Sequence, residues 1–124
     1  KGTLADLEKL TQAAAAAVGA TLVFRQSNHE VELVDWVQEA HRQAQAVVIN
    51  AGGYTHTSVA IHDALKVLTI PVVEVHLSNP GIREEFRHKS LVSPAASGII
   101  AGFGSLGYRL AIEAAAALAD QKRV

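Results

Sequence analysis

The segment "PVVEVH" (residues 71–76) predicts a buried strand, because valines occupy both of its faces. Successive side chains of a strand point to opposite sides, so Glu74 and His76 share one face and Val73 lies on the other. Strands that are apolar on both faces are typical of parallel sheets covered by helices on either side. The segment therefore favours an α/β fold.

Helical and extended patterns alternate along the rest of the chain. Thr3 and Asp6 have the spacing of a capping box, which begins a helix, and Gly19 follows where that helix should end. The further predicted helices are 30–43, 57–68 and 104–121, and the further predicted strands are "TLVFRQ" (21–26), "AVVIN" (46–50) and "GIIAGF" (98–103). Helices between strands indicate a parallel, doubly wound sheet. We expect a single domain over residues 1–124.

The composition limits the classes of function. The chain has 124 residues, of which 49% are hydrophobic and 19% charged, and this suits one soluble domain with its own core. A net charge of −1 gives no basic footprint for nucleic acid. The chain has no cysteine for disulfides or thiolate chemistry, and no apolar run approaches the roughly 20 residues of a membrane span. We expect a cytoplasmic location.

Polar segments follow the predicted strands at their carboxyl ends, which is where open α/β sheets bind ligands. These segments are 27–30, 50–58, 76–87 and 102–107. The connection from 77 to 97 is also too long for a simple loop, and long loops in compact domains are more often functional. We therefore expect the functional site at this edge of the sheet.

Two glycine-containing segments at this edge favour different roles. "GFGSLG" (102–107) has the spacing of a dinucleotide site, but no further strand follows with an acidic residue to hold a ribose. We interpret its glycines as packing a helix closely against a strand. "NAGGYTHTS" (50–58) places Asn50 and His56 beside a helix start, which suits an anion, although an ordinary capped loop also explains it. The segment lacks the lysine of a P-loop, which argues against a nucleotide or flavin binder.

The six histidines do not have the spacing of a metal site, since the chain contains no H-E-x-x-H motif and no cysteine. His41 and His88 are expected to be solvated, and His29 is left open. His62 and Asp63 lie on the face of their helix that points away from its apolar residues. They are expected to face solvent or, for Asp63, to reach a neighbouring subunit.

Glu74 and His76 form an unusual pair, because a charge buried in a sheet needs a partner. On the same strand face, the carboxylate can accept a hydrogen bond from one ring nitrogen. That bond fixes the tautomer and turns the other nitrogen toward the ligand edge. A histidine held in this way suits general acid or base catalysis near neutral pH. A purely structural pair is the alternative.

Three long segments carry a family resemblance. They are "FRQSNHEVELVDWVQEA" (24–40), "VINAGGYTHTSVAIHDAL" (48–65) and "IPVVEVHLSNPGIREEFRHKSLVSPAASGIIAGFGSLGYRLAIEA" (70–114). They resemble the type II 3-dehydroquinate dehydratases, with Ala51 and Gly53 where that family commonly has proline and alanine. The resemblance implies a flavodoxin-like fold and a homododecamer of four trimers. It also implies dehydration of 3-dehydroquinate to 3-dehydroshikimate, in the shikimate pathway or quinate catabolism, without a metal or organic cofactor.

The resemblance further implies a role for each residue of the expected site. His76 would be the general acid that protonates the departing hydroxyl, and Glu74 would orient it. The substrate carboxylate would be held by Asn50, Ser78 and the backbone N–H groups of Leu77 and Ser78. The ring hydroxyls would be bound by His56, Arg87 and, from the adjacent subunit, Asp63. The elimination would be anti and pass through an enolate stabilised by positioned donors.

One part of the family pattern has no counterpart in the sequence. Before the segment that matches Thr3, family members carry a first strand, an N-G-P-N-L-N-like turn and a lid with an arginine and the tyrosine base. The sequence begins Lys1-Gly2 and contains no methionine, so we expect a processed, engineered or truncated start. In the strand order 2-1-3-4-5 the absent strand is the central one, which would leave 21–26 without a partner beside 46–50.

A non-catalytic homologue is the alternative function. It would keep the carboxylate cradle but lack the base, and it would bind the substrate or only contribute to the oligomer. Tyr54 and Tyr108 belong to other motifs and are not expected to replace the missing base. If the 124 residues act alone, we expect negligible turnover.

Overall fold

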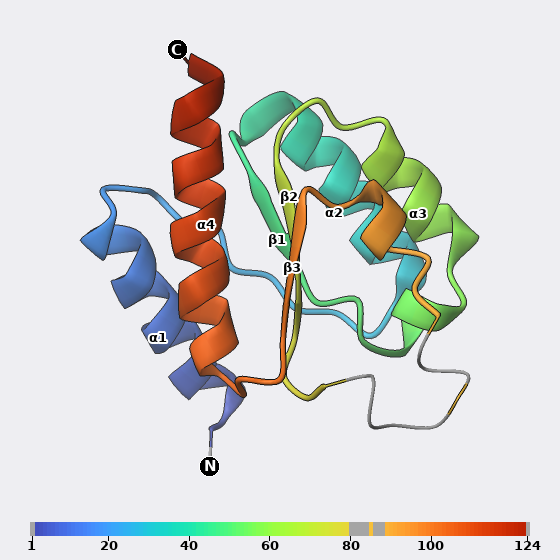
Figure 1. Ribbon diagram of the computed structural model, residues 1–124, viewed down its shortest axis with the longest axis horizontal. Helices are drawn as coiled ribbons and strands as arrows, with labels where there is room; N and C mark the ends of the chain where they lie inside the picture. Colours follow the sequence, from blue (N-terminus) through green and yellow to red (C-terminus); the bar gives the residue numbers. More distant parts are fainter. Residues whose placement is uncertain (1, 80–84, 86–88, 124) are drawn as a thin grey trace.

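Three parallel strands lie between two layers of helices in the computed structural model (Figure 1). The structure describes residues 2–79, 85 and 89–123. The strands are β1 (Val47–Ile49), β2 (Val72–His76) and β3 (Gly98–Ala101), and they pair in the order β1-β2-β3. Both strand pairs are parallel, with Ile49 beside Glu74 and His76 beside Ala101. The predicted α/β sheet is therefore confirmed.

The helices cover both faces of this sheet, as a doubly wound fold requires (Figure 1). Helices α1 (Leu4–Ala17) and α4 (Leu106–Arg123) lie on one face, and α2 (Glu30–Gln43) and α3 (Val59–Lys66) lie on the other. Two short 3₁₀ helices, η1 (Gly52–His56) and η4 (Ser93–Ala95), belong to the connections after β1 and before β3. The arrangement agrees with the expected flavodoxin-like architecture.

Strand β2 is buried on both faces, as its valines predict. Val72 packs in the cluster that includes Ile61 and Leu65 of α3, whereas Val73 and Val75 pack against α4. Burying a valine side chain fully contributes about 1.5–3 kcal/mol. Since Glu74 shares the face of Val72, its side chain lies on the α3 side of the sheet.

Helix α1 begins at the capping box that the sequence indicates, and α3 begins at Ser58, within the first two residues of the predicted helix 57–68. The Thr3 side chain accepts a hydrogen bond of 3.1 Å from Asp6 N, and Asp6 accepts one of 3.2 Å from Thr3 N. The Ser58 hydroxyl accepts one of 3.0 Å from Ile61 N at the start of α3. Such caps typically stabilise a helix by about 1 kcal/mol, because they satisfy N–H groups that have no partner within the helix.

The predicted strand 21–26 is wrong, because this segment forms no strand in the structure. Leu22 packs with Val48 against the cluster of Ala14, Ala15 and Ile112, so the segment still covers the core. A strand also needs a hydrogen-bonding neighbour, and no strand among the described residues pairs with the β1 edge that faces away from β2. The segment is therefore held by side-chain packing and by a hydrogen bond of 3.2 Å that Gln12 Nε2 of α1 donates to Leu22 O.

The glycines of 102–107 pack a helix against the sheet, as interpreted above. A Cβ atom on Gly107 would lie 3.2 Å from Val75 Cγ2, so the absence of a side chain lets α4 approach β2. Gly104 has φ +58°, a backbone conformation that other residues seldom adopt, in the turn between β3 and α4. The dinucleotide interpretation is not needed to explain these glycines.

None of the helices in the described part of the chain is long and apolar enough to cross a membrane.

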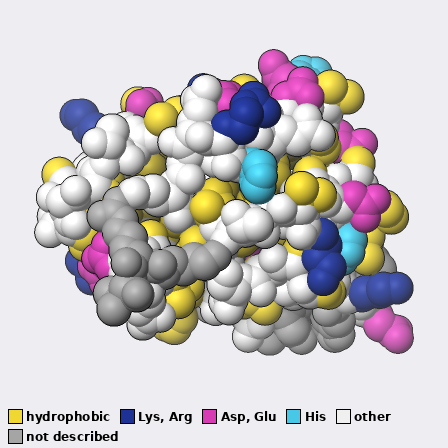
Figure 2. Space-filling model, turned by 90° about the horizontal axis from the view of Figure 1, so that it is seen from above, with side chains coloured by type: hydrophobic (Ala, Val, Ile, Leu, Met, Phe, Trp, Pro, Cys, Tyr) yellow, Lys and Arg dark blue, Asp and Glu magenta, His cyan; other side chains and the backbone are white. Residues whose placement is uncertain are grey.

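An open groove of about 440 Å³ lies at the amino ends of the strands, between residues 68–72, residues 95–97 and the last turns of α4. None of the described residues that line it is ionisable. Figure 2 views this end of the molecule and shows acidic and basic side chains scattered over it rather than gathered in one patch.

Candidate active site

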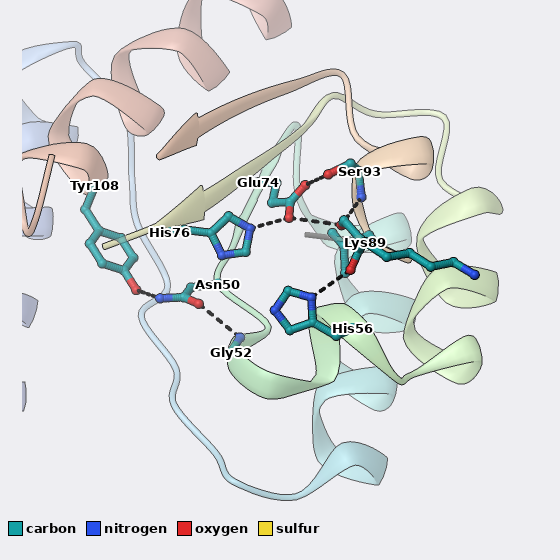
Figure 3. Close-up of polar contacts among 10 residues, drawn as sticks. Asn50, Gly52, His56, Glu74, His76, Lys89, Ser93 and Tyr108 are labelled. Atoms are coloured by element: carbon teal, nitrogen blue, oxygen red, sulfur yellow. Dashed lines mark hydrogen bonds and ion pairs between the residues drawn. The ribbon is translucent and has the colours of Figure 1, made fainter. Parts of the chain in front are cut away.

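The carboxyl ends of β1 and β2 bring the predicted site residues together. Ile49 is the last residue of β1 and pairs with Glu74, so Asn50 and His76 meet at the same edge of the sheet. The 3₁₀ helix η1 follows directly and carries His56. Figure 3 shows Asn50, His56 and His76 around one space at this edge. The parallel sheet therefore builds the site from segments that are distant in sequence.

The Glu74 side chain is fully buried, with an exposed fraction of 0%. Both carboxylate oxygens have partners: Ser93 Oγ donates to Oε1 over 2.6 Å, and Oε2 bonds His76 Nε2 and accepts from Ser90 Oγ over 3.3 Å. Burial raises the pKa of Glu74, but the hydrogen bonds from His76, Ser93 and Ser90, with the charge of His76, together hold it below its ordinary value. Glu74 is thus held as a carboxylate.

His76 is oriented by this carboxylate. Its Nε2 faces Glu74, and its side chain is 12% exposed. Figure 3 shows the second ring nitrogen turned away from Glu74, toward the side where Asn50 and His56 lie. The expectation that one nitrogen binds Glu74 while the other faces the ligand edge agrees with this arrangement. The ring can therefore exchange a proton with a group bound between these residues.

Asn50 is fixed by both ends of its amide. Its Nδ2 donates a hydrogen bond of 2.9 Å to Tyr108 Oη on α4, and its Oδ1 accepts one of 3.0 Å from Gly52 N. Burial raises the pKa of Tyr108, and the bond to Asn50 opposes that shift only in part. A neutral phenol therefore holds the amide in one orientation, and the second hydrogen of Nδ2 remains for a ligand.

His56 is oriented by the segment that follows the long loop. Its Nδ1 lies 2.7 Å from the carbonyl oxygen of Lys89, which places the ring beside the space near His76 (Figure 3). The same segment bonds back to η1 through Leu91 N, which donates to Thr55 O over 2.6 Å. The η1 helix and residues 89–91 thus fix each other's positions.

The other predicted site residues are distributed as follows. Leu77 and Ser78 are exposed directly after β2, at the edge where the site lies. Asp63 is exposed on α3, as expected for a residue that faces solvent or a second subunit. Arg87 lies outside the described residues. The roles implied for all of these side chains stay predictions.

The outcome for the remaining histidines differs from residue to residue. His41 is exposed, as expected, and His29 is exposed at the N-cap of α2, whereas His88 lies outside the described residues. The solvent-facing interpretation of His62 is wrong. Its Nδ1 lies 2.6 Å from the carbonyl oxygen of Leu91, because the segment after the long loop crosses over α3. Within the described ranges, no three His, Asp or Glu side chains come together as metal ligands would.

Sequence reasoning missed Ser90, Ser93 and Tyr108, which support the predicted residues rather than face a ligand directly. The two serines bond Glu74 and the tyrosine bonds Asn50. The only sequence signal for the serines is their position in an unusually long polar connection. For Tyr108, the signal is its place in the first turns of the helix that packs on the strand ends.

Comparisons with known proteins agree with this geometry. Residues 1–116 match the protein family described as "Dehydroquinase class II". The chain is 60% identical over 117 residues to a 3-dehydroquinate dehydratase of Phenylobacterium zucineum, a match that covers 94% of this chain and 81% of the relative. It is 50% identical over 121 residues to a 3-dehydroquinate dehydratase of Sinorhizobium medicae, a match that covers 98% of this chain and 82% of that relative.

Solved structures give the same result. A type II dehydroquinase from Propionibacterium acnes superposes with a TM-score of 0.89 at 39% identity, covering 93% of this chain and 85% of the other. A 3-dehydroquinate dehydratase-like protein from Bifidobacterium longum superposes with a TM-score of 0.80 at 34% identity. This match covers 94% of this chain and 89% of the other. The family match, the level of identity and the shared fold agree, so the chain belongs to the class II dehydroquinases, a family of lyase enzymes.

Proposed function

We propose that this chain supplies the acid and the carboxylate-binding groups for the dehydration of 3-dehydroquinate to 3-dehydroshikimate, by an anti elimination in which a base first takes a proton to form an enolate. The family resemblance assigns this base to a lid tyrosine that has no counterpart in residues 1–124. The reaction would serve the shikimate pathway or quinate catabolism, whose chemistry at this step is the same. The observation that carries the proposal is the Glu74–His76 pair at the carboxyl end of β2. The names of the relatives from Phenylobacterium and Sinorhizobium support it.

The leaving hydroxyl needs a proton in order to depart as water, and we propose that His76 gives it. Its Nε2 is occupied by Glu74, so the proton comes from the ring nitrogen on the side of Asn50 and His56. When His76 donates this proton, the ring becomes neutral beside a carboxylate that prefers a cation. Glu74 therefore serves as the group that orients the imidazole.

The substrate is a small carboxylated ring, and neutral donors suit its carboxylate. Asn50 would contribute the amide hydrogen that Tyr108 leaves available, together with Ser78 and the N–H groups of Leu77 and Ser78. His56 and Arg87 would bind the ring hydroxyls. Holding the substrate between these groups brings the departing oxygen to His76, and such orientation accounts for a large part of the rate enhancement in eliminations of this kind.

The test follows the absorbance of the conjugated enone in the product after 3-dehydroquinate is added. Each variant is measured in a chain that also carries the family's first strand and lid, because residues 1–124 alone are expected to show negligible turnover. The wild type is compared with His76→Ala and with His41→Ala, which removes an exposed imidazole on α2 as a matched control. We expect His76→Ala to lose roughly 10²-fold or more in kcat, and His41→Ala to keep the wild-type rate.

Two outcomes contradict the proposal. A His76→Ala variant that turns over at the wild-type rate excludes this residue as the acid. A wild type that binds 3-dehydroquinate in calorimetry but never converts it is a non-catalytic binding protein.

We also propose that the chain assembles into trimers, four of which form a dodecamer, and that Asp63 reaches the site of an adjacent subunit. The exposure of large apolar side chains at both ends of the helix that carries Asp63 supports this, since Val59 is 59% exposed and Val67, the residue after α3, is 68% exposed. Sedimentation should give a species about twelve times the 13.1 kDa of the chain. Val59→Lys should shift it to smaller species, and a monomeric wild type contradicts the assembly.

A further inference from the structure

The Glu74 carboxylate is held by two serines to which no function has been given above. Ser93 Oγ donates to one oxygen over 2.6 Å, and Ser90 Oγ donates to the other over 3.3 Å, beside His76. Ser93 therefore satisfies the oxygen that His76 does not reach. Both serines come from the end of the long connection after β2, whereas Glu74 comes from the strand itself.

We propose that Ser93 and Ser90 are positioning residues, which fix the plane of the Glu74 carboxylate so that it holds His76 in a single tautomer and ring orientation. The proposal rests on the proposed function of His76 as the acid. A carboxylate bound only through His76 could rotate about its last bond. A second donor on the opposite oxygen prevents that rotation, in the way that outer hydrogen bonds orient a metal-binding histidine.

Burial makes this second donor important. Glu74 has no exposed surface, and its neighbours in the sheet, Ile49 on β1 and Ile99 on β3, are apolar. An oxygen left without a partner in such surroundings carries a large desolvation penalty. The carboxyl group would lower that penalty by taking up a proton or by turning toward His76. Either response changes the hydrogen bond that sets the orientation of the imidazole.

The hydrogen bonds made by Ser90 determine where its own hydroxyl hydrogen points. Ser90 Oγ accepts from Val92 N over 3.1 Å and from Ser93 N over 2.9 Å, and these two bonds occupy its lone pairs. The single hydroxyl hydrogen therefore points to Glu74. Because the same bonds hold the backbone of Ser93, Ser90 also fixes the position from which Ser93 donates.

The segment that carries the serines is anchored to the other wall of the site. Thr55 O accepts a bond of 2.6 Å from Leu91 N, and the rings of His62 and His56 contact the carbonyl oxygens of Leu91 and Lys89 over 2.6 and 2.7 Å. The charged group of Lys89 extends away from Glu74 in Figure 3. His76 is therefore the ionisable partner of Glu74 among the described groups that bond it.

The experiment compares Ser93→Ala with Ser93→Thr, which keeps the hydroxyl, and with Ser97→Ala as a matched control. Ser97 lies on the same connection, and its hydroxyl accepts a bond of 3.0 Å from Val72 N on β2 without touching Glu74. Ring ¹⁵N shifts of His76 report which nitrogen carries the proton, and the ¹³C shift of the Glu74 carboxyl reports its titration. Both signals are read without turnover.

We expect Ser93→Ala to raise the pKa of Glu74, since one of the bonds that lower it is lost, and to convert the single tautomer of His76 into a mixture. In turnover, kcat should fall about tenfold with KM unchanged, because the serine contacts no substrate. Ser93→Thr should restore the pKa of Glu74, the single tautomer of His76 and kcat. Ser97→Ala should leave all three as they are in the wild type.

Unchanged Glu74 and His76 signals in Ser93→Ala overturn the inference, as does an equal effect of Ser97→Ala. If Ser93→Ala fails to fold, Ser93→Cys supplies a weaker donor of similar size, and wild-type signals in that variant also overturn it. A wild type without turnover rejects the proposed function alone, because the two NMR signals still decide the role of the serines.

Discussion

The Asn50 side chain donates a hydrogen bond of 2.9 Å to the Tyr108 hydroxyl, which joins the loop after β1 to the first turns of α4. The opposite end of the amide accepts from Gly52 N over 3.0 Å. An amide has two chemically different ends, so these two bonds decide which end faces a ligand. The orientation of the predicted carboxylate donor thus depends on a residue 58 positions away in sequence.

The first prediction concerns this bond. Tyr108→Phe keeps the ring and removes the hydroxyl, so Asn50 loses the contact that distinguishes its two ends. We expect KM for 3-dehydroquinate to rise about two- to tenfold, the usual range for one neutral hydrogen bond, with a smaller change in kcat. Tyr54→Phe is the control, because the Tyr54 hydroxyl donates to Asn28 O and makes no bond to Asn50. Equal KM values for wild type and Tyr108→Phe would show that the bond has no role in binding.

The second prediction concerns the dependence of stability on pH. The folded state lowers the pKa of Glu74, so this group stabilises the protein above the ordinary carboxyl value of about 4.3. That contribution is lost as the pH falls through the folded pKa. We expect the free energy of unfolding in urea to decrease more between pH 6 and pH 3 in the wild type than in Glu74→Gln.

Glu8→Gln, which removes an exposed carboxyl on α1, controls for the loss of one titrating group. If the free energy of unfolding decreases equally in Glu74→Gln and in the wild type between pH 6 and pH 3, the buried pair does not contribute to stability in acid.

The third prediction concerns the turn before α4. Gly104 has φ +58°, where a residue with a side chain is strained by about 1–2 kcal/mol. Gly104→Ala should therefore lower the free energy of unfolding by about 1 kcal/mol, because the reduced freedom of the unfolded chain offsets part of the strain. Gly98→Ala is the control, since Gly98 does not have positive φ and a Cβ there would meet no atom within 4 Å. Identical urea midpoints for the two variants would contradict the strain.

The fourth prediction concerns the contact between His62 and Leu91. Replacing His62 with alanine removes the ring that bonds the Leu91 carbonyl oxygen over 2.6 Å. The Leu91 amide, which bonds Thr55 O, should then exchange its hydrogen about tenfold faster, because local opening of this segment becomes easier. His41→Ala should not change that rate. Unchanged exchange in His62→Ala would show that the segment is held without the imidazole.

Much of the fold follows from local patterns in the sequence. The valines of 71–76 predict a strand with two buried faces, and the structure places Val72 and Val75 in separate clusters on opposite sides of the sheet. The capping box of Thr3 and Asp6 predicts where α1 begins, because the hydrogen bonds it makes are within four residues. Such features need no knowledge of distant parts of the chain.

The features that could not be predicted depend on distant partners. Residues 21–26 have the composition of a strand, but a strand exists only where another strand pairs with it. The partners of Glu74 and Asn50 are likewise separated from them by 16 to 58 positions, so a single sequence does not reveal Ser90, Ser93 or Tyr108 as neighbours. His62 was predicted to face solvent for the same reason, because Leu91, whose carbonyl oxygen its ring contacts, lies 29 positions away in the sequence.

Because Ile49 pairs with Glu74, catalytic activity depends on the register between β1 and β2. If β2 slipped by a single position, every side chain would exchange sides, and the imidazole would point at α4 while a valine faced the substrate. Selection for catalysis in a library of sheet variants would therefore also select for correct alignment, and loss of turnover in a chain that is still helical would be an early sign of a misaligned sheet.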